Sequence, residues 1–307
     1  MKKLNIVVIM GGISTEREIS LSGGAIVVEN IDTTKYNVYE LIVDEPMDVV
    51  NKMPDDVDFA LIILHGKFGE DGTIQAMLEA MNIKYSGCDV LTSALCMNKN
   101  MTKKILKSAS IPTAKWIHIK NGDVINYDAI DTIGYPVIVK PCNGGPSVAT
   151  FKVDKKEDIA DALNKALSVD ESILVEEYLD GEEYTSFIVD GEVLPTIKIT
   201  SQAGFFDYES KYSDDENIAA KEEVVQLDDA LQKQLNDTSI ACWNAFNCRG
   251  YVRVDFILHN GIFYTLELNT LPGMSQASLI PKSAKACGIN YTQLIDRLIE
   301  SSLWKEN

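Results

Sequence analysis

The chain contains 307 residues, of which 46% are hydrophobic, and it carries a formal net charge of −18 at pH 7. This length and hydrophobic content allow a large buried core and predict two or three domains. The negative charge argues against a nucleic-acid partner, because phosphate binding needs a basic surface. No apolar run approaches the roughly 20 residues of a membrane span, so we expect no membrane association.

The N-terminal apolar run stops at Gly11 and Gly12, which predicts a first β-strand and not a signal peptide. The six cysteines form neither a CxxC pair nor a zinc-binding spacing. Without a secretory signal, we expect reduced thiols in a cytoplasmic protein. Cys142 lies in a glycine-rich loop, but no nearby histidine supports a nucleophile, so we interpret it as a buried or incidental thiol.

The first 97 residues alternate between strand and helix patterns. Apolar runs predict strands over residues 5–10, 38–43, 59–64 and 83–85, separated by helices over 17–30 and 73–81. Continuous apolar strands separated by helices are typical of a parallel sheet covered on both faces. The sequence therefore predicts an N-terminal parallel α/β domain.

The composition changes near residue 98, where a lysine-rich segment begins. After it, the sequence predicts strands over 116–119, 137–140, 151–153, 173–179, 184–189 and 193–199. It also predicts helices over 156–167, 228–246 and 291–304, with a hairpin before the last helix. This order indicates a smaller α+β unit followed by a larger one. We expect domain limits at 1–97, 98–180 and 181–307.

The predicted hairpin is the most informative segment of the chain. Two apolar runs flank Asn260 and Gly261, a pair that favours a two-residue hairpin turn. Side chains alternate faces along a strand, so folding at this turn can bring Asp255 close to Glu267 and Asn269.

These three polar residues interrupt otherwise apolar strands, and two interpretations stand. Buried carboxylates need a partner, and a hard, oxygen-seeking cation such as Mg²⁺ is a suitable one. Asp, Glu and Asn are all depleted in strands, which favours this metal-binding interpretation. Alternatively, the residues lie on a solvated face, where Arg253 simply pairs with one carboxylate.

A glycine-rich stretch, GGISTEREISLSGG, follows the first predicted strand. Its glycines permit a sharp turn, and Ser14 or Thr15 could cap a helix entered at Glu16 or Arg17. Helix N-termini favour anions, but the spacing is not GxGxxG, and Glu16 and Glu18 would repel a pyrophosphate. An acid at this place suits an ammonium-bearing substrate better, and an ordinary capped helix is the alternative.

Further candidate ligand-binding residues follow along the chain. His65 ends an apolar strand, and open α/β sheets bind ligands at the carboxyl ends of their strands. The alternative is that His65 has a purely structural role. Lys140 ends another strand beside the glycine-rich loop 142–147, which could close as a lid over nucleotide phosphates. Lys99 is a second candidate cation, and Glu176 could hold ribose or adenine groups. The remaining candidates are Glu183, Lys211 and Tyr212.

In this order the motifs resemble those of the D-alanine–D-alanine ligases of the ATP-grasp superfamily. The resemblance covers nearly the whole chain and rests on MGGISTEREISLSGG, LHGKFGEDGTIQ, YSGCDVLTSALCMNK, VKP, FFDYESKY, RVDF and ELNTLPGMSQASLIPKS. It implies an N-terminal parallel α/β domain followed by a two-part ATP-grasp fold. It also implies ATP-dependent ligation of two D-alanines through an acyl phosphate, for the synthesis of peptidoglycan precursors.

The resemblance also implies where each substrate binds. Glu16 would bind the ammonium of the first D-alanine, with His65 nearby. Ser278 and Leu279 would bind the carboxylate of the second D-alanine.

The same resemblance implies the residues that take part in catalysis. Arg253 and the Gly273 amide would stabilise the reacting oxyanion, and Tyr212 would close the active-site loop. The residues implied to bind ATP are Lys99, Lys140, Glu176, Tyr178, Leu179, Glu183 and Lys211. Those implied to hold Mg²⁺, or alternatively Mn²⁺, are Asp255, Glu267 and Asn269.

Two positions depart from the family's pattern. The family's loop has two consecutive serines after a glycine, whereas here Pro146 follows Gly145. The first serine normally bonds to the loop tyrosine and the N-terminal glutamate, but proline offers neither a hydroxyl nor an N–H. A lysine common beside the ATP-binding glutamate is Glu177 here. A weakly active or inactive nucleotide-binding paralogue is therefore the alternative function.

A dinucleotide-dependent oxidoreductase is a third hypothesis, but the GxGxxG pattern that it requires is missing. The sequence leaves open whether the second substrate is D-alanine, D-serine or D-lactate, although Lys211 and Tyr212 resemble the dipeptide-forming members. The family is commonly dimeric, so we expect a homodimer.

Overall fold

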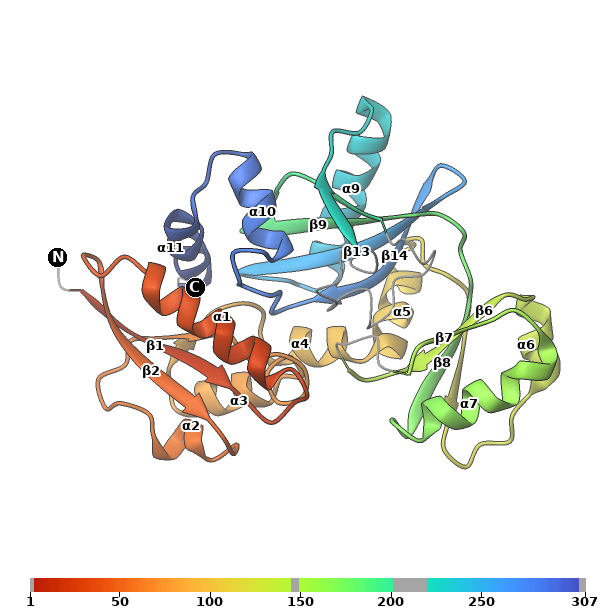
Figure 1. Cartoon of the computed structure of the whole chain (residues 1–307), viewed down its shortest axis with the longest axis horizontal. Helices are drawn as coiled ribbons and strands as arrows, with labels where there is room; N and C mark the ends of the chain where they lie inside the picture. The colour runs from red at the N-terminus through yellow and green to blue at the C-terminus, as the bar shows by residue number, and fades with distance from the viewer. Residues whose placement is uncertain (1–2, 145–148, 201–219, 304–307) are drawn as a thin grey trace.

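The computed structural model describes residues 3–144, 149–200 and 220–303. These residues form three β-sheets that are spread along the long axis of the molecule (Figure 1). The sheet made by the last strands of the chain lies between the other two. No helix in these three ranges is both long enough and apolar enough to span a bilayer.

The N-terminal sheet is parallel and has the strand order β2-β1-β3-β4. Its strands are β1 (Leu4–Gly11), β2 (Tyr36–Val43), β3 (Phe59–Ile62) and β4 (Lys84–Tyr85), and its helices are α1 (Arg17–Asn30), α2 (Asp48–Asn51) and α3 (Thr73–Ala80). The two middle strands, β1 and β3, are buried along nearly their whole length, as expected for a covered parallel sheet. The predicted parallel α/β domain is confirmed.

The second sheet along the chain, called the central sheet because of its place in the sequence, is antiparallel and has the order β5-β8-β6-β7. Its elements are β5 (Trp116–Lys120), α6 (Tyr127–Ile133), β6 (Val137–Pro141), β7 (Phe151–Val153), α7 (Ile159–Leu167) and β8 (Ser172–Glu177). Ile130 of α6 and Leu163 of α7 pack with Val139 and Val175 in one small core. The helix predicted over 156–167 begins as a 3₁₀ turn at Lys156–Asp158.

The third sheet is antiparallel, with the order β12-β11-β9-β13-β14 and a short strand, β10, beside β9. Its strands are β9 (Glu182–Val189), β10 (Glu192–Val193), β11 (Ile197–Thr200), β12 (Lys221–Val224), β13 (Tyr251–His259) and β14 (Ile262–Asn269). The helices around it are α4 (Val90–Met97), α5 (Lys99–Ser108), α9 (Asp229–Ala245), α10 (Leu279–Ala286) and α11 (Tyr291–Ser302).

The single strand predicted over 193–199 is wrong, because two strands form there. Strand β10 ends at Val193 and β11 starts at Ile197, although both pair with β9. Pro195 lies between them, and proline has no N–H to donate to a strand ladder. The break therefore follows from the residue type at one position.

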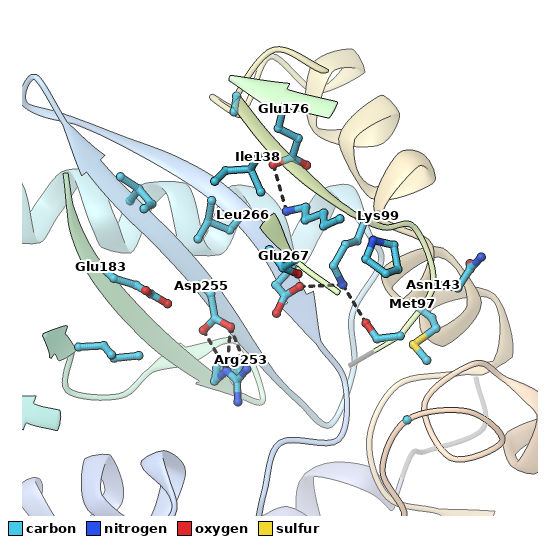
Figure 2. Close-up of a pocket in the computed structure, with 18 of the residues that line it drawn as sticks. Met97, Lys99, Ile138, Asn143, Glu176, Glu183, Arg253, Asp255, Leu266 and Glu267 are labelled. Atoms are coloured by element: carbon cyan, nitrogen blue, oxygen red, sulfur yellow. Dashed lines mark hydrogen bonds and ion pairs between the residues drawn. The ribbon is translucent and has the colours of Figure 1, made fainter. Parts of the chain in front are cut away.

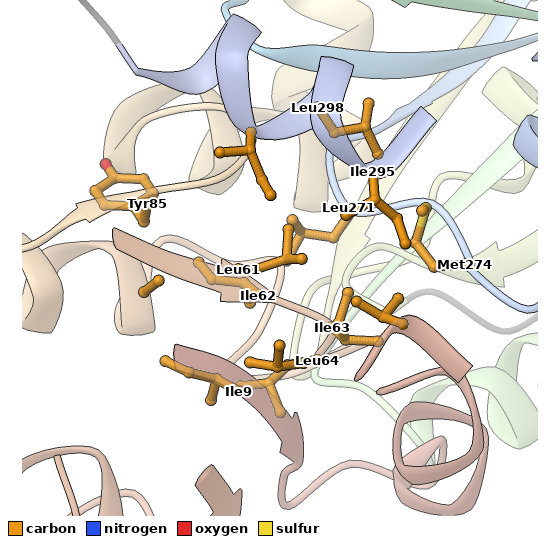
Figure 3. Packing of buried hydrophobic residues seen from close by; sticks show 14 of the residues in the cluster. Ile9, Leu61, Ile62, Ile63, Leu64, Tyr85, Leu271, Met274, Ile295 and Leu298 are labelled. Carbon is orange, nitrogen blue, oxygen red and sulfur yellow. The ribbon is translucent and has the colours of Figure 1, made fainter. Parts of the chain in front are cut away.

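One hydrophobic core joins the N-terminal sheet to the helices at the end of the chain. Figure 3 shows Leu61 and Ile63 facing Met274, Ile295 and Leu298, and all five side chains are buried. Burial of apolar side chains of this size is worth about 1.5–3 kcal/mol each. The N-terminal domain is therefore fixed against α10 and α11, and the loop after β1 is held in a defined place.

Ser20 fixes α1 against the carboxyl ends of β1 and β3, where the loop after β1 begins. Its hydroxyl donates to the Ile63 carbonyl at 2.7 Å and accepts from the Gly11 amide at 2.9 Å. The side chain is completely buried. One hydroxyl therefore connects α1, the end of β1 and the chain after β3.

We predict that Ser20→Ala lowers the free energy of unfolding by about 1–3 kcal/mol, because two buried backbone groups lose this partner. Denaturant unfolding measures the change. Ser22→Ala, an exposed position on the same helix, is the matched control and should change little. Equal losses in the two variants would show that the buried hydroxyl does not stabilise the domain.

Candidate active site

The hairpin of β13 and β14 places two carboxylates side by side. Asp255 is the pairing partner of Glu267, and Arg253 is the partner of Asn269. The turn between the strands has positive φ values of 50° and 77° at its two residues, which suits the Asn-Gly pair found there. The predicted hairpin and the closeness of these two carboxylates are confirmed.

Asp255 and Arg253 form a buried, two-point ion pair. The guanidinium Nε lies 2.9 Å from Oδ1 and Nη2 lies 2.8 Å from Oδ2, and the Thr185 hydroxyl donates to Oδ1 at 2.6 Å. Burial opposes the charged guanidinium, but the charge and hydrogen bonds of Asp255 and the charges of Glu267 and Glu70 together outweigh burial and raise the pKa of Arg253. Arg253 does pair with one carboxylate, as the alternative interpretation holds, but this pair does not lie on a solvated face, because Asp255 and Arg253 are both less than 10% exposed. Glu267 and Asn269 are half-buried.

Lys99 connects Glu267 to the glycine-rich loop. Its ammonium lies 3.0 Å from Glu267 Oε2 and donates to the Gly144 carbonyl at 2.9 Å (Figure 2). Burial favours the neutral amine, but the charge and hydrogen bond of Glu267, together with the charge of Glu176, outweigh burial, so the pKa of Lys99 is raised. The lysine therefore remains charged between β14 and the start of the loop.

Glu176, on β8, lies between two ammonium groups. Lys140 Nζ is 3.0 Å from Oε2 and Lys103 Nζ is 3.4 Å from Oε1. Burial alone would raise the pKa of this carboxyl group, but the two lysines lower it below its usual value. A buried, ionised carboxylate is thus maintained near the C-terminal end of β8.

Glu16 occupies the N-cap position of α1 and is 7% exposed. The expected cap from Ser14 or Thr15 is wrong, since no side chain caps this helix, and the Ser14 hydroxyl accepts only from the Glu16 amide at 3.2 Å. A Cβ atom added to Gly66 would come within 3.1 Å of Glu16 Oε2. The carboxylate therefore lies directly against the loop that follows β3.

These groups surround one cavity of about 1020 Å³, which lies between the central sheet, the third sheet and the loop after β1. This volume is at the upper end of the range for small-molecule sites, roughly 300–1,000 Å³. The sequence-predicted residues that line it are Glu16, Lys99, Lys140, Glu176, Tyr178, Leu179, Glu183, Arg253, Asp255, Glu267 and Leu279.

Other predicted residues lie near this cavity but do not line it. His65 is buried behind Gly66, and the Asn269 side chain accepts from the Leu271 amide at 3.1 Å. Gly273 and Ser278 lie against each other, since a Cβ atom on Gly273 would be 3.0 Å from the Ser278 hydroxyl. Lys211, Tyr212 and Pro146 fall outside the described residues, as does the expected link between Glu16 and Tyr212.

Acidic and basic side chains from the central sheet, the third sheet, α5 and the loop after β1 therefore meet in this cavity. Two family models match: "D-ala D-ala ligase C-terminus" over residues 105–300 and "D-ala D-ala ligase N-terminus" over residues 45–88. A D-alanine–D-alanine ligase of Clostridium botulinum (strain Loch Maree / Type A3) is 48% identical over 300 residues, which cover 98% of this chain and 99% of the relative. The chain belongs to the D-alanine–D-alanine ligase family.

Solved structures of this family have the same fold. A D-alanine–D-alanine ligase from Bacillus anthracis matches with a TM-score of 0.90 and 43% identity, covering 98% of this chain and 97% of that one. A structure of the Bacillus anthracis ligase complexed with ATP matches with a TM-score of 0.88 and 41% identity over the same shares. The expected fold, a parallel α/β domain followed by a two-part ATP-grasp fold, is confirmed.

Two residues around the ligase cavity were not found from the sequence. Lys103, the second partner of Glu176, is fully buried on α5. It stands four residues after Lys99, a spacing that places both on one helix face and could have indicated a shared site. Asp170 accepts from the Asn143 amide at 2.7 Å and so holds the start of the glycine-rich loop, but no local motif marks it.

We predict that Asp255→Asn lowers the free energy of unfolding of the nucleotide-free protein by about 3–5 kcal/mol, because it leaves the Arg253 charge buried without a partner. Denaturant unfolding in EDTA measures the loss. Asp154→Asn is the control, because its pair with Lys152 is exposed and should contribute little. If both variants lose equally little, the buried pair does not stabilise the hairpin.

Proposed function

We propose that this protein joins two D-alanine molecules with the conversion of ATP to ADP and phosphate, for the synthesis of peptidoglycan precursors. The observation that carries the proposal is the 48% identity to a D-alanine–D-alanine ligase over 98% of this chain. The charged cavity supports the same function, because a reaction between ATP and a carboxylate needs cations around both. The alternative of a weakly active paralogue, suggested by Pro146, has no support in the comparisons.

ATP is proposed to bind between the central and third sheets. Lys99 and Lys140 would contact its phosphates, because both ammonium groups line the cavity. Glu176 would accept a hydrogen bond from the base, with Tyr178, Leu179 and Glu183 around the rest of the nucleoside. Lys211 is proposed to contact the phosphates as well, and Tyr212 to close the loop above them.

Asp255, Glu267 and Asn269 are proposed to hold Mg²⁺, or Mn²⁺ in its place. They offer only oxygen donors, which these hard cations prefer, and the two carboxylates are direct partners across the hairpin. The described residues contain no group of three His, Cys, Asp or Glu side chains arranged for a metal, and here the third ligand is an amide. Bound at this place, the metal ion would neutralise charge on the transferring phosphoryl group.

The reaction has two steps, and the chain supplies groups for both. A carboxylate oxygen of the first D-alanine attacks the γ-phosphorus, ADP leaves, and an acyl phosphate forms. The amine of the second D-alanine then attacks the carbonyl carbon and loses a proton, and phosphate leaves. Arg253 and the Gly273 amide are proposed to stabilise the oxyanion of this second step.

The two D-alanines are proposed to bind at the N-terminal end of the cavity. Glu16 would pair with the ammonium of the first, with His65 behind it. Ser278 and Leu279, at the start of α10, would hold the carboxylate of the second. We further propose a cytoplasmic homodimer, and domain limits at 1–97, 98–180 and 181–307, each range containing one sheet.

The deciding experiment measures ADP and D-alanyl-D-alanine together, with ATP, Mg²⁺ and D-alanine as the only substrates. We expect equal amounts of both products. ADP without dipeptide would favour the paralogue, and absence of both products would reject the function.

We predict that Glu267→Gln reduces Mg²⁺-dependent turnover at least roughly a hundredfold, because it removes one charge from the proposed cation site while keeping the side chain's shape. Initial rates over a Mg²⁺ titration measure the effect. Glu192→Gln, which changes an exposed carboxylate paired with Arg297, is the control. Near-native turnover of Glu267→Gln at ordinary Mg²⁺ would mean that the metal assignment is wrong.

We predict that Glu16→Gln raises the KM for the first D-alanine about tenfold to a hundredfold, because a hydrogen bond to a charged group is lost. The melting temperature should remain nearly unchanged. Glu18→Gln, a change at an exposed position on the same helix, serves as the control. A large fall in melting temperature with unaltered D-alanine affinity would instead assign Glu16 a structural role.

A further inference from the structure

Lys103 is a fully buried lysine that no step of the proposed reaction uses. Its ammonium donates to the Thr113 hydroxyl at 2.8 Å and to the Ala114 carbonyl at 3.2 Å, and it lies 3.4 Å from Glu176 Oε1. Burial lowers the pKa of Lys103 to about 8, which still leaves it mostly charged near neutral pH. A charge is costly to bury, so its retention with three oxygen partners indicates a specific task.

The position of Lys103 relative to the cavity indicates that task. Glu176 and Ala114 line the cavity, whereas Lys103 lies behind them and does not reach it. Lys140, the other partner of Glu176, does line the cavity and is proposed to turn toward the ATP phosphates. When it does so, Lys103 remains as the ammonium that keeps Glu176 ionised and in place.

Lys103 also connects Glu176 to the opposite wall of the cavity. Thr113, which accepts from Lys103, donates its own hydroxyl proton to the Thr265 carbonyl on β14 at 2.8 Å. The next residue on β14, Leu266, lines the cavity opposite Ile138 (Figure 2). A chain of two hydrogen bonds and an ion pair therefore fixes the distance between Glu176 and β14.

We propose that Lys103 is a positioning residue for nucleobase selection: it holds Glu176 as an ionised acceptor for the amino group of adenine and thereby makes the protein prefer ATP to GTP. An ionised carboxylate only accepts hydrogen bonds. Adenine presents an amino donor where guanine presents a carbonyl oxygen, which a fixed carboxylate repels. A site built around one hydrogen-bond pattern rejects the analogue that lacks it. The inference depends on the proposed contact between Glu176 and the base.

The test compares the dissociation constants of ATP, GTP and dATP, measured by calorimetry with Mg²⁺ and without D-alanine, in the full chain and in Lys103→Met. We expect Lys103→Met to reduce the preference for ATP over GTP about tenfold to a hundredfold. The ratio of ATP to dATP should not change, because Lys103 does not position the ribose. Lys103→Arg, which keeps the charge, should restore part of the preference, and Lys104→Met, at the exposed neighbouring position on α5, should have no effect.

A folded Lys103→Met variant with an unchanged preference for ATP over GTP would overturn the proposal, as would a lost preference that Lys103→Arg does not restore even in part. If Lys103→Met does not fold, Thr113→Val is the deciding variant, because it removes one acceptor of Lys103 and the hydrogen bond to β14. It should reduce the preference for ATP over GTP several-fold. An unchanged preference would refute the role of Lys103 in nucleobase selection. Because binding is measured without D-alanine, failure of the ligase function would appear separately, as nucleotide selection without dipeptide formation.

Discussion

The structure of the cavity depends on buried or half-buried carboxylates that are each matched by a cation. Asp255 pairs with Arg253, Glu267 with Lys99, and Glu176 with Lys140 and Lys103. Pairs of this kind contribute little net stability compared with apolar residues of the same volume, and the loss of one partner costs several kcal/mol. In a chain with a net charge of −18, the collection of these cations around one cavity is better explained by function than by stability.

The fold determines how these pairs meet. A two-residue turn sets the register of β13 and β14 as far as Phe256, and a register shift between Asp255 and Phe256 then places Asp255 opposite Glu267. Helix α5 contributes both Lys99 and Lys103, so one helix supplies a cation to each of the two sheets that enclose the cavity. The core shared by β3, α10 and α11 fixes the N-terminal domain, so that the loop carrying Glu16 forms the remaining wall of the cavity.

Much of this arrangement could be predicted from local sequence. The parallel sheet follows from apolar strands alternating with helices, and the hairpin of β13 and β14 follows from the Asn260–Gly261 turn. Helix α1 has the limits that were predicted, residues 17–30. These features depend on neighbours in the chain, which sequence patterns report well.

The remaining features depend on contacts between distant segments. The pairing of Lys99 with Glu267 and of Lys103 with Glu176 joins residues far apart in sequence, and no periodicity encodes it. Lys103 is not predicted because the many lysines of this segment obscure the buried face of α5 in the sequence pattern. The break in the strand at Pro195 is not predicted because Leu194 before it and Ile197 shortly after it continue the apolar pattern.

The formation of an acyl phosphate in this cavity is tested most directly by following the oxygen atoms of D-alanine. The protein is supplied with D-alanine labelled with ¹⁸O in its carboxylate, together with unlabelled ATP and Mg²⁺, and the phosphate released is analysed by mass spectrometry. The two-step reaction predicts one labelled oxygen in each phosphate for every dipeptide formed. Phosphate without label would mean that water attacks ATP, and it would contradict the transfer of the phosphoryl group to the D-alanine carboxylate.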